Sequence, residues 1–180
     1  MTTDRASDAS VSRTSPLADI LLDGLIAGMI GAIAVALWFL VLDVMAGRPL
    51  YTPALLGGVL LHGSQAVAQE VVIAPIEIAA YTAFHFVAFI VVGVAFSYMM
   101  TLFERFPIMF FVLLVLFLCL QVGFFFMDVV LGAQLLGRLK AWTVVVANLL
   151  ASAGMALYLW RRHPSVVKGI ERLWQDEGGE

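Results

Sequence analysis

The chain has 180 residues, of which 62% are hydrophobic and only 13% are charged, and its mean hydropathy is +1.00. Soluble globular domains are about 45–50% apolar, so this composition excludes an ordinary water-soluble domain and predicts an integral membrane protein. The net charge of −3 and the scattered basic residues exclude the basic surface of a nucleic-acid-binding protein. The single cysteine, Cys119, excludes an internal disulfide and a multi-cysteine metal site.

The N-terminal segment 1–16 is rich in Ser, Thr and Asp and has no apolar periodicity. This composition predicts a disordered tail. The segment does not match a secretory signal, because its charge is mixed and the apolar stretch that follows is too long. We therefore expect the first apolar helix to stay attached to the chain.

Four long apolar stretches follow, with expected helix bounds at 20–46, 77–103, 106–131 and 139–161. Each is long enough to cross a hydrocarbon core of about 30 Å at about 1.5 Å per residue. The expected fold is an all-α integral membrane protein, a four-helix transmembrane bundle over residues 17–162.

A shorter apolar segment lies between the first two spans. Thr52 and Pro53 are a good N-cap and first-turn pair, and Gly63 is a good stop, so a half-helix is expected at 53–62. It is too short to span, so it either lies on the extracytoplasmic interface or dips back into the protein. We expect it to seal this loop rather than to cover a polar cavity.

The arginine and lysine residues predict the orientation of the spans. Seven lie on the side of the two termini and three on the opposite side, namely Arg48, Arg138 and Lys140. Because basic residues are enriched in cytoplasmic loops, both termini are expected in the cytoplasm, with the protein in a bacterial inner membrane. In the tail 163–180, Val166, Val167, Ile170, Leu173 and Trp174 recur at helical spacing and predict an amphipathic helix on the cytoplasmic lipid surface.

Small residues predict how the spans pack. Gly24, Gly28, Ala32 and Ala36 recur at intervals of four in the first span, which favours close packing inside the bundle, with a dimer contact as the alternative. The third span is bulky on almost all sides and is expected to face lipid or a partner protein. The motif Asp-Val-x-x-Gly recurs at Asp43 and Asp128, which indicates either an internal duplication or a chance match.

Polar side chains inside a membrane are costly and are candidates for function. Five such residues are expected to form a polar layer in the outer half of the bundle: Asp43, Asp128, His85, Asn148 and Gln121. The favoured interpretation of each residue is structural: the aspartates cap the outer loops and hold Arg48 or Arg138, and the other three form hydrogen bonds between helices. The alternative is that the layer relays protons or holds a cation in transit.

The outer rim completes the set of candidate residues, which comprises Arg48, Tyr51, Thr52, Pro53 and His62. No metal-ligand spacing, catalytic triad or phosphate loop is present in the sequence, so neither an enzyme nor a bound cofactor is expected. A haem would need paired histidines, and only His85 with His62 is geometrically suitable.

Three functions follow from these features. The favoured one is a non-catalytic accessory, structural or assembly subunit of a larger membrane complex, with protein partners or copies of itself as neighbours in the bilayer. The alternative is a small oligomeric carrier or channel for protons, cations or a small polar solute. The third is a haem- or quinone-linked redox subunit.

Overall fold

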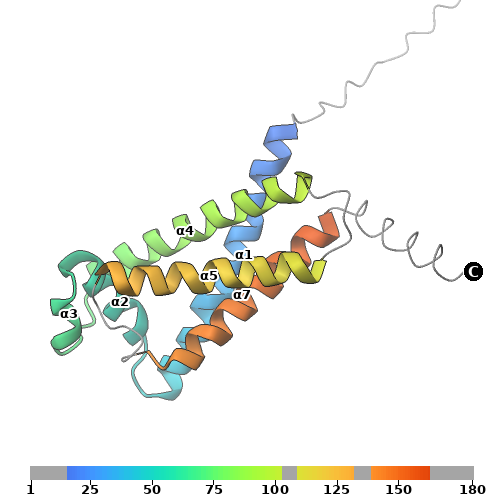
Figure 1. Ribbon diagram of the computed structural model, residues 1–180. Helices are drawn as coiled ribbons and strands as arrows, with labels where there is room; N and C mark the ends of the chain where they lie inside the picture. Colours follow the sequence, from blue (N-terminus) through green and yellow to red (C-terminus); the bar gives the residue numbers. More distant parts are fainter. Residues whose placement is uncertain (1–15, 103–108, 132–138, 163–180) are drawn as a thin grey trace, which may run out of the picture.

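The computed structural model describes residues 16–102, 109–131 and 139–162, which are mostly helical and contain no β-strand. The helices in chain order are α1 (Pro16–Met45), α2 (Tyr51–His62), α3 (Gln65–Ala68), α4 (Pro75–Leu102), α5 (Met109–Leu131) and α7 (Ala141–Arg162) (Figure 1). The expected disordered tail before Pro16 and the amphipathic helix in 163–180 lie outside the described residues.

The four long helices agree with the expected spans to within about one helical turn. Both α1 and α4 begin at a proline, Pro16 and Pro75. Proline is favoured at the first helical position, because the N–H that it lacks would have no partner there. As a result α1 begins earlier than expected and also includes Asp19. The short helix α3, in the polar loop, was not expected.

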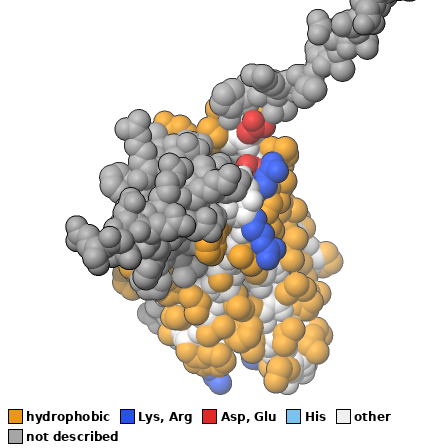
Figure 2. Space-filling model, turned by 90° about the vertical axis from the view of Figure 1, so that its right-hand side faces the viewer, with side chains coloured by type: hydrophobic (Ala, Val, Ile, Leu, Met, Phe, Trp, Pro, Cys, Tyr) orange, Lys and Arg blue, Asp and Glu red, His pale blue; other side chains and the backbone are white. Residues whose placement is uncertain are grey.

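Among the described residues, three helical segments are long and apolar enough to cross a membrane: Leu17–Met45, Pro75–Met100 and Ala141–Arg162. The described part of α5 adds a shorter apolar stretch, Leu114–Phe126. In the face drawn in Figure 2, hydrophobic side chains cover most of the described surface, and the visible Lys and Arg side chains lie toward its upper and lower parts. These features are those of a helical membrane protein.

The helices α1 and α4 pack closely together, and their contact depends on glycine. A Cβ built at Gly93 of α4 would lie 2.6 Å from the backbone nitrogen of Gly28 and would also overlap the carbonyl oxygen of Gly24. A side chain at any of these three positions would push the helices apart. The small-residue face of α1 therefore packs within the chain, in the manner predicted for helices in lipid.

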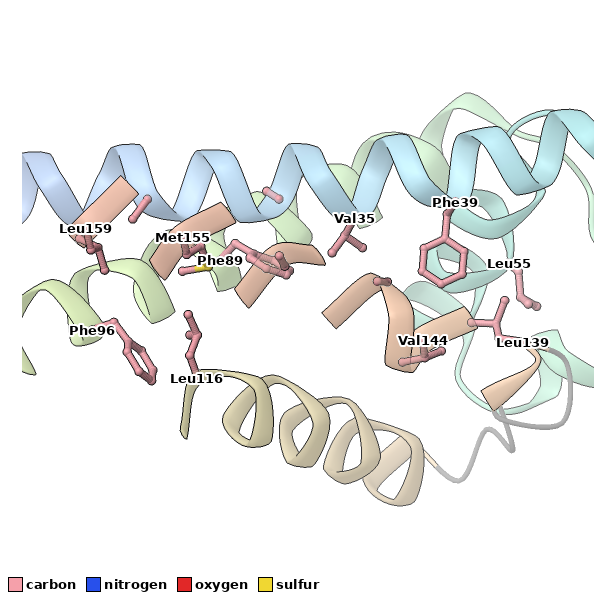
Figure 3. Packing of buried hydrophobic residues seen from close by; sticks show 14 of the residues in the cluster. Val35, Phe39, Leu55, Phe89, Phe96, Leu116, Leu139, Val144, Met155 and Leu159 are labelled. Atoms are coloured by element: carbon pink, nitrogen blue, oxygen red, sulfur yellow. The ribbon is translucent and has the colours of Figure 1, made fainter. Parts of the chain in front are cut away.

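On its other side α1 packs against α7. Gly31 admits the Met155 side chain, and Trp38 Nε1 donates a hydrogen bond of 3.0 Å to the carbonyl oxygen of Thr143. Figure 3 shows side chains of α1, α2, α4 and α7 meeting in this core. Among the described side chains of α5, Leu116 alone belongs to the buried hydrophobic core. The helix α5 is thus the least integrated of the long helices.

The half-helix α2 packs into the bundle instead of lying on its surface. Leu55 and Val59 are each only 1% exposed, and Gly57 lies against the backbone of Glu77 in α4. Gly63, with φ of 73°, ends the helix as predicted. Since α2 has a close contact with α4, it is part of the protein core at this end of the bundle.

Candidate functional site

Asp43 holds the beginning of α2. The residue is 6% exposed, and its carboxylate accepts two hydrogen bonds from Thr52, one from the backbone N–H (2.7 Å) and one from the hydroxyl (2.8 Å). The first N–H groups of a helix have no partner within the helix, and a negative charge is favourable at that end. Asp43 therefore caps α2 from the end of α1, and the expectation that Thr52 is itself the N-cap is wrong.

The expected ion pair between Asp43 and Arg48 does not form. The Arg48 guanidinium lies over the ring of Tyr51, with its Cζ 4.0 Å from the ring centroid. The backbone N–H of Arg48 donates a hydrogen bond of 2.8 Å to the backbone carbonyl oxygen of Asp43. Both carboxylate oxygens of Asp43 are already engaged by Thr52, and a cation over an aromatic face is independently stabilised. Arg138, the partner expected for Asp128, lies outside the described residues.

His85 joins α4 to α1. Its Nε2 lies 3.1 Å from the carbonyl oxygen of Ala32, and its Nδ1 lies 3.3 Å from the hydroxyl of Tyr81. Because a carbonyl can only accept, Nε2 carries the proton, and Nδ1 accepts from the tyrosine. The ring also packs against Phe89, with centroids 4.8 Å apart. Both nitrogens of this histidine are therefore bonded to the protein itself.

Asn148 and Gln121 meet across α7 and α5, where the asparagine amide donates to the glutamine carbonyl oxygen at 2.9 Å. Of the five residues predicted to form one polar layer, these two are in direct contact. Asp43 and His85 have separate partners, and Asp128 is half-buried on α5. The structure thus distributes the predicted layer over at least three helix contacts.

A large cavity lies beside His85. Its volume is about 390 Å³, and its walls come from α1, α2, α4, α5 and α7. Apart from Tyr81, His85 and Asn148, nearly every lining side chain is apolar. A smaller cavity of about 190 Å³ is lined by Asp43 and Thr52 as well as by Tyr81 and His85. These last two side chains therefore border both cavities.

Of the two remaining rim residues, only Pro53 lines either of these cavities, and it lines the smaller one. His62, at the end of α2, has its Nε2 3.5 Å from Glu77 Oε1, which is a long contact at an exposed position. Since Glu77 precedes His85 by two turns, about 12 Å along α4, the structure does not support His62 and His85 as a pair of haem ligands.

Two functional candidates were missed from the sequence. Asp23 is 6% exposed and accepts hydrogen bonds from Arg162 Nε (2.9 Å) and from the Tyr158 hydroxyl (3.1 Å), so it joins the start of α1 to the end of α7. The sequence feature that could have predicted this pair is an acidic residue near the start of the first span and two arginines at the end of the last span. Tyr81 was also missed, although its spacing of four residues from His85 places both on one helix face.

Chemically, the site offers a few hydrogen-bonding groups in apolar surroundings. Within the described part of the chain, no group of three or more His, Cys, Asp and Glu side chains could hold a metal ion. No protein-family model matches the chain, and no curated protein or solved structure matches it significantly. Its function must therefore be inferred from its own residues.

Proposed function

We propose that this chain is a non-catalytic multi-pass membrane protein, an accessory, structural or assembly subunit of a larger complex in a bacterial inner membrane. In this proposal α1, α4, α5 and α7 are four transmembrane helices, and both termini are cytoplasmic. The proposal rests on the hydrogen bonds of the polar groups that lie within the proposed transmembrane helices. Asp43, His85 and Asn148 each bond to another group of the same chain.

A relay or an ion pathway needs polar groups that exchange partners with a passing proton or ion. Both oxygens of Asp43 accept from Thr52, and both ring nitrogens of His85 have protein partners. Such bonds stabilise one arrangement of the helices, because an unpaired polar group in a low-dielectric interior is costly. This pattern supports a structural role for the polar residues.

The outer surface of α5 supports a contact with another subunit. Its exposed apolar side chains include Leu118, Val122, Phe125 and Val129. Helices in lipid associate mainly through van der Waals packing, and α5 shares little buried surface with its own bundle. A helix from a neighbouring subunit would supply the packing that α5 lacks.

Purification from native membranes in mild detergent tests this proposal. We expect a stoichiometric partner protein to accompany the wild-type chain and to be lost from a variant carrying Phe125→Ala and Val129→Ala. The matched control carries Leu37→Ala and Val41→Ala, which removes exposed apolar side chains of α1 and should leave the partner bound. A homogeneous preparation that contains only this chain would contradict the subunit proposal.

A small carrier is the second candidate, and one observation favours it. Tyr81 and His85 border both cavities, so the Asp43 end and the Asn148 end of the site are linked through them. Reconstitution into liposomes that contain a pH-sensitive dye tests this candidate. Proton flux through the wild-type protein that disappears with Asp43→Asn, at equal amounts of folded protein, would favour the carrier over the subunit.

A further inference from the structure

The large cavity opens at the lipid-exposed surface between α4 and α5. Phe84 of α4 and Phe126 of α5 both line it, and they are 41% and 62% exposed. The two side chains therefore mark a mouth in the apolar surface of the helices. From there the cavity extends inward to Val35 of α1 and Asn148 of α7.

Gly123 leaves part of this cavity empty. A Cβ built at this position would meet no atom within 4 Å, although α5 faces the rest of the bundle here. The volume of about 390 Å³ lies in the range of small-molecule sites, about 300–1,000 Å³. Water is poorly stabilised in an apolar cavity of this kind, so the expected occupant is an apolar molecule from the surrounding bilayer.

Two polar groups determine which apolar molecule fits best. The Tyr81 hydroxyl donates a hydrogen bond to His85 Nδ1, so its oxygen can still accept a hydrogen bond. The Asn148 amide uses one N–H for Gln121 and has a second N–H to donate. A ligand hydroxyl can donate to the tyrosine or accept from the asparagine, whereas a pure hydrocarbon leaves both groups unused.

The ligand should also be uncharged. Among the described residues that line the cavity there is no Lys, Arg, Asp or Glu. Moving an isolated carboxylate or phosphate into such surroundings carries a large desolvation cost. This excludes fatty acids in their ionised form and the headgroups of phospholipids from the interior of the cavity.

We propose that the cavity between α4 and α5 binds one uncharged long-chain alcohol, with its chain along the apolar walls and its hydroxyl at Tyr81 or Asn148. The chain is either an isoprenoid or a straight alkyl chain, since both have the same single polar group. The binding site is independent of any protein partner, because its walls all belong to this chain.

Native mass spectrometry and calorimetric titration of the detergent-purified protein test the proposal, with farnesol, dodecan-1-ol and dodecanoic acid as probes. We expect saturable 1:1 binding of at least one alcohol and at least tenfold weaker binding of the acid at pH 8. Tighter binding of farnesol than of dodecan-1-ol would identify an isoprenoid as the occupant, and the reverse would identify an alkyl chain. Equal binding of alcohols and acid, or no saturable binding, would overturn the proposal.

Three variants locate the site. Gly123→Phe fills the cavity and should weaken alcohol binding at least tenfold, whereas Val122→Phe adds the same side chain at a neighbouring exposed position and should leave binding unchanged. Tyr81→Phe should lower the preference for the alcohols over dodecanoic acid. Thermal unfolding confirms that each variant is folded, and Gly123→Leu replaces Gly123→Phe if the larger side chain prevents folding. Unchanged binding in the folded cavity-filling variant would contradict the assignment.

Discussion

Glycine has opposite effects at the contact between α1 and α4 and at the cavity between α4 and α5. At Gly93, any side chain would overlap the backbone of α1, so the missing Cβ allows two helices to approach closely. At Gly123, a Cβ would meet nothing within 4 Å, so the missing side chain adds to a cavity. One half of the bundle is closely packed, and the other half has room for a ligand.

The close contact also brings polar groups together. His85 of α4 reaches the carbonyl oxygen of Ala32 in α1 because the two helix backbones are near each other. The helix α5 is joined to α7 by the hydrogen bond between Gln121 and Asn148. Helix packing in lipid depends on van der Waals contact, so the two halves should differ in stability and in tolerance of substitution.

The largest effect is expected at the contact between α1 and α4. Gly93→Leu should destabilise the fold by about 3 kcal/mol or more, since the new side chain cannot avoid the backbone of Gly24 and Gly28. The measurement is the amount of monodisperse protein in detergent and its unfolding temperature. A variant as stable as the wild type would show that the α1–α4 contact is not rigid.

The next largest effect is expected at the cap of α2. Asp43→Ala should cost about 1–3 kcal/mol, because the Thr52 N–H and hydroxyl lose a charged acceptor. Thr52→Val removes only the hydroxyl bond and is expected to cost less. Denaturant titration of both variants checks this order, and a larger loss in Thr52→Val would show that the carboxylate is not the cap.

A smaller effect is expected at the loose side of the bundle. Asn148→Leu should cost about 0.6 kcal/mol, the average value of a hydrogen bond between helices in a membrane. The loss of the bond to Gln121 should also increase hydrogen exchange in α5 more than in α4. Equal changes in both helices would mean that α5 is held by contacts other than this bond.

The smallest effect is expected at Gly123. Replacement by Ala should change stability by no more than about 0.5 kcal/mol, because the added methyl group meets no neighbour. The same substitution at Gly28 serves as the matched control and should be clearly destabilising, since its Cβ would lie 2.5 Å from the carbonyl oxygen of Phe89. Similar unfolding temperatures for the two alanine variants would show that Gly28 and Gly123 do not differ in how closely their surroundings are packed.

Local sequence features predicted the helices themselves. Long uncharged apolar stretches required helices, because backbone groups in lipid must be bonded within the segment. Gly63 ended α2 where expected, and the small residues of α1 marked a packing face that meets α4. Each of these features depends on residues close together in the chain, so composition and spacing were sufficient to predict them.

The partners of the polar side chains were decided by the tertiary structure. The sequence suggested Arg48 for Asp43, but the fold of α2 against α4 brings Thr52 to the carboxylate instead. Asp23 and Arg162 are 139 residues apart in the chain, and only the packing of α1 on α7 joins them.

The cavity depends on tertiary structure for the same physical reason. Its walls come from segments distant in sequence, and its volume depends on how closely α5 approaches the bundle. Apolar periodicity shows which helix faces avoid water. It does not specify how far apart two such faces lie, because in lipid an apolar face is equally well solvated by a neighbouring helix or by a lipid chain.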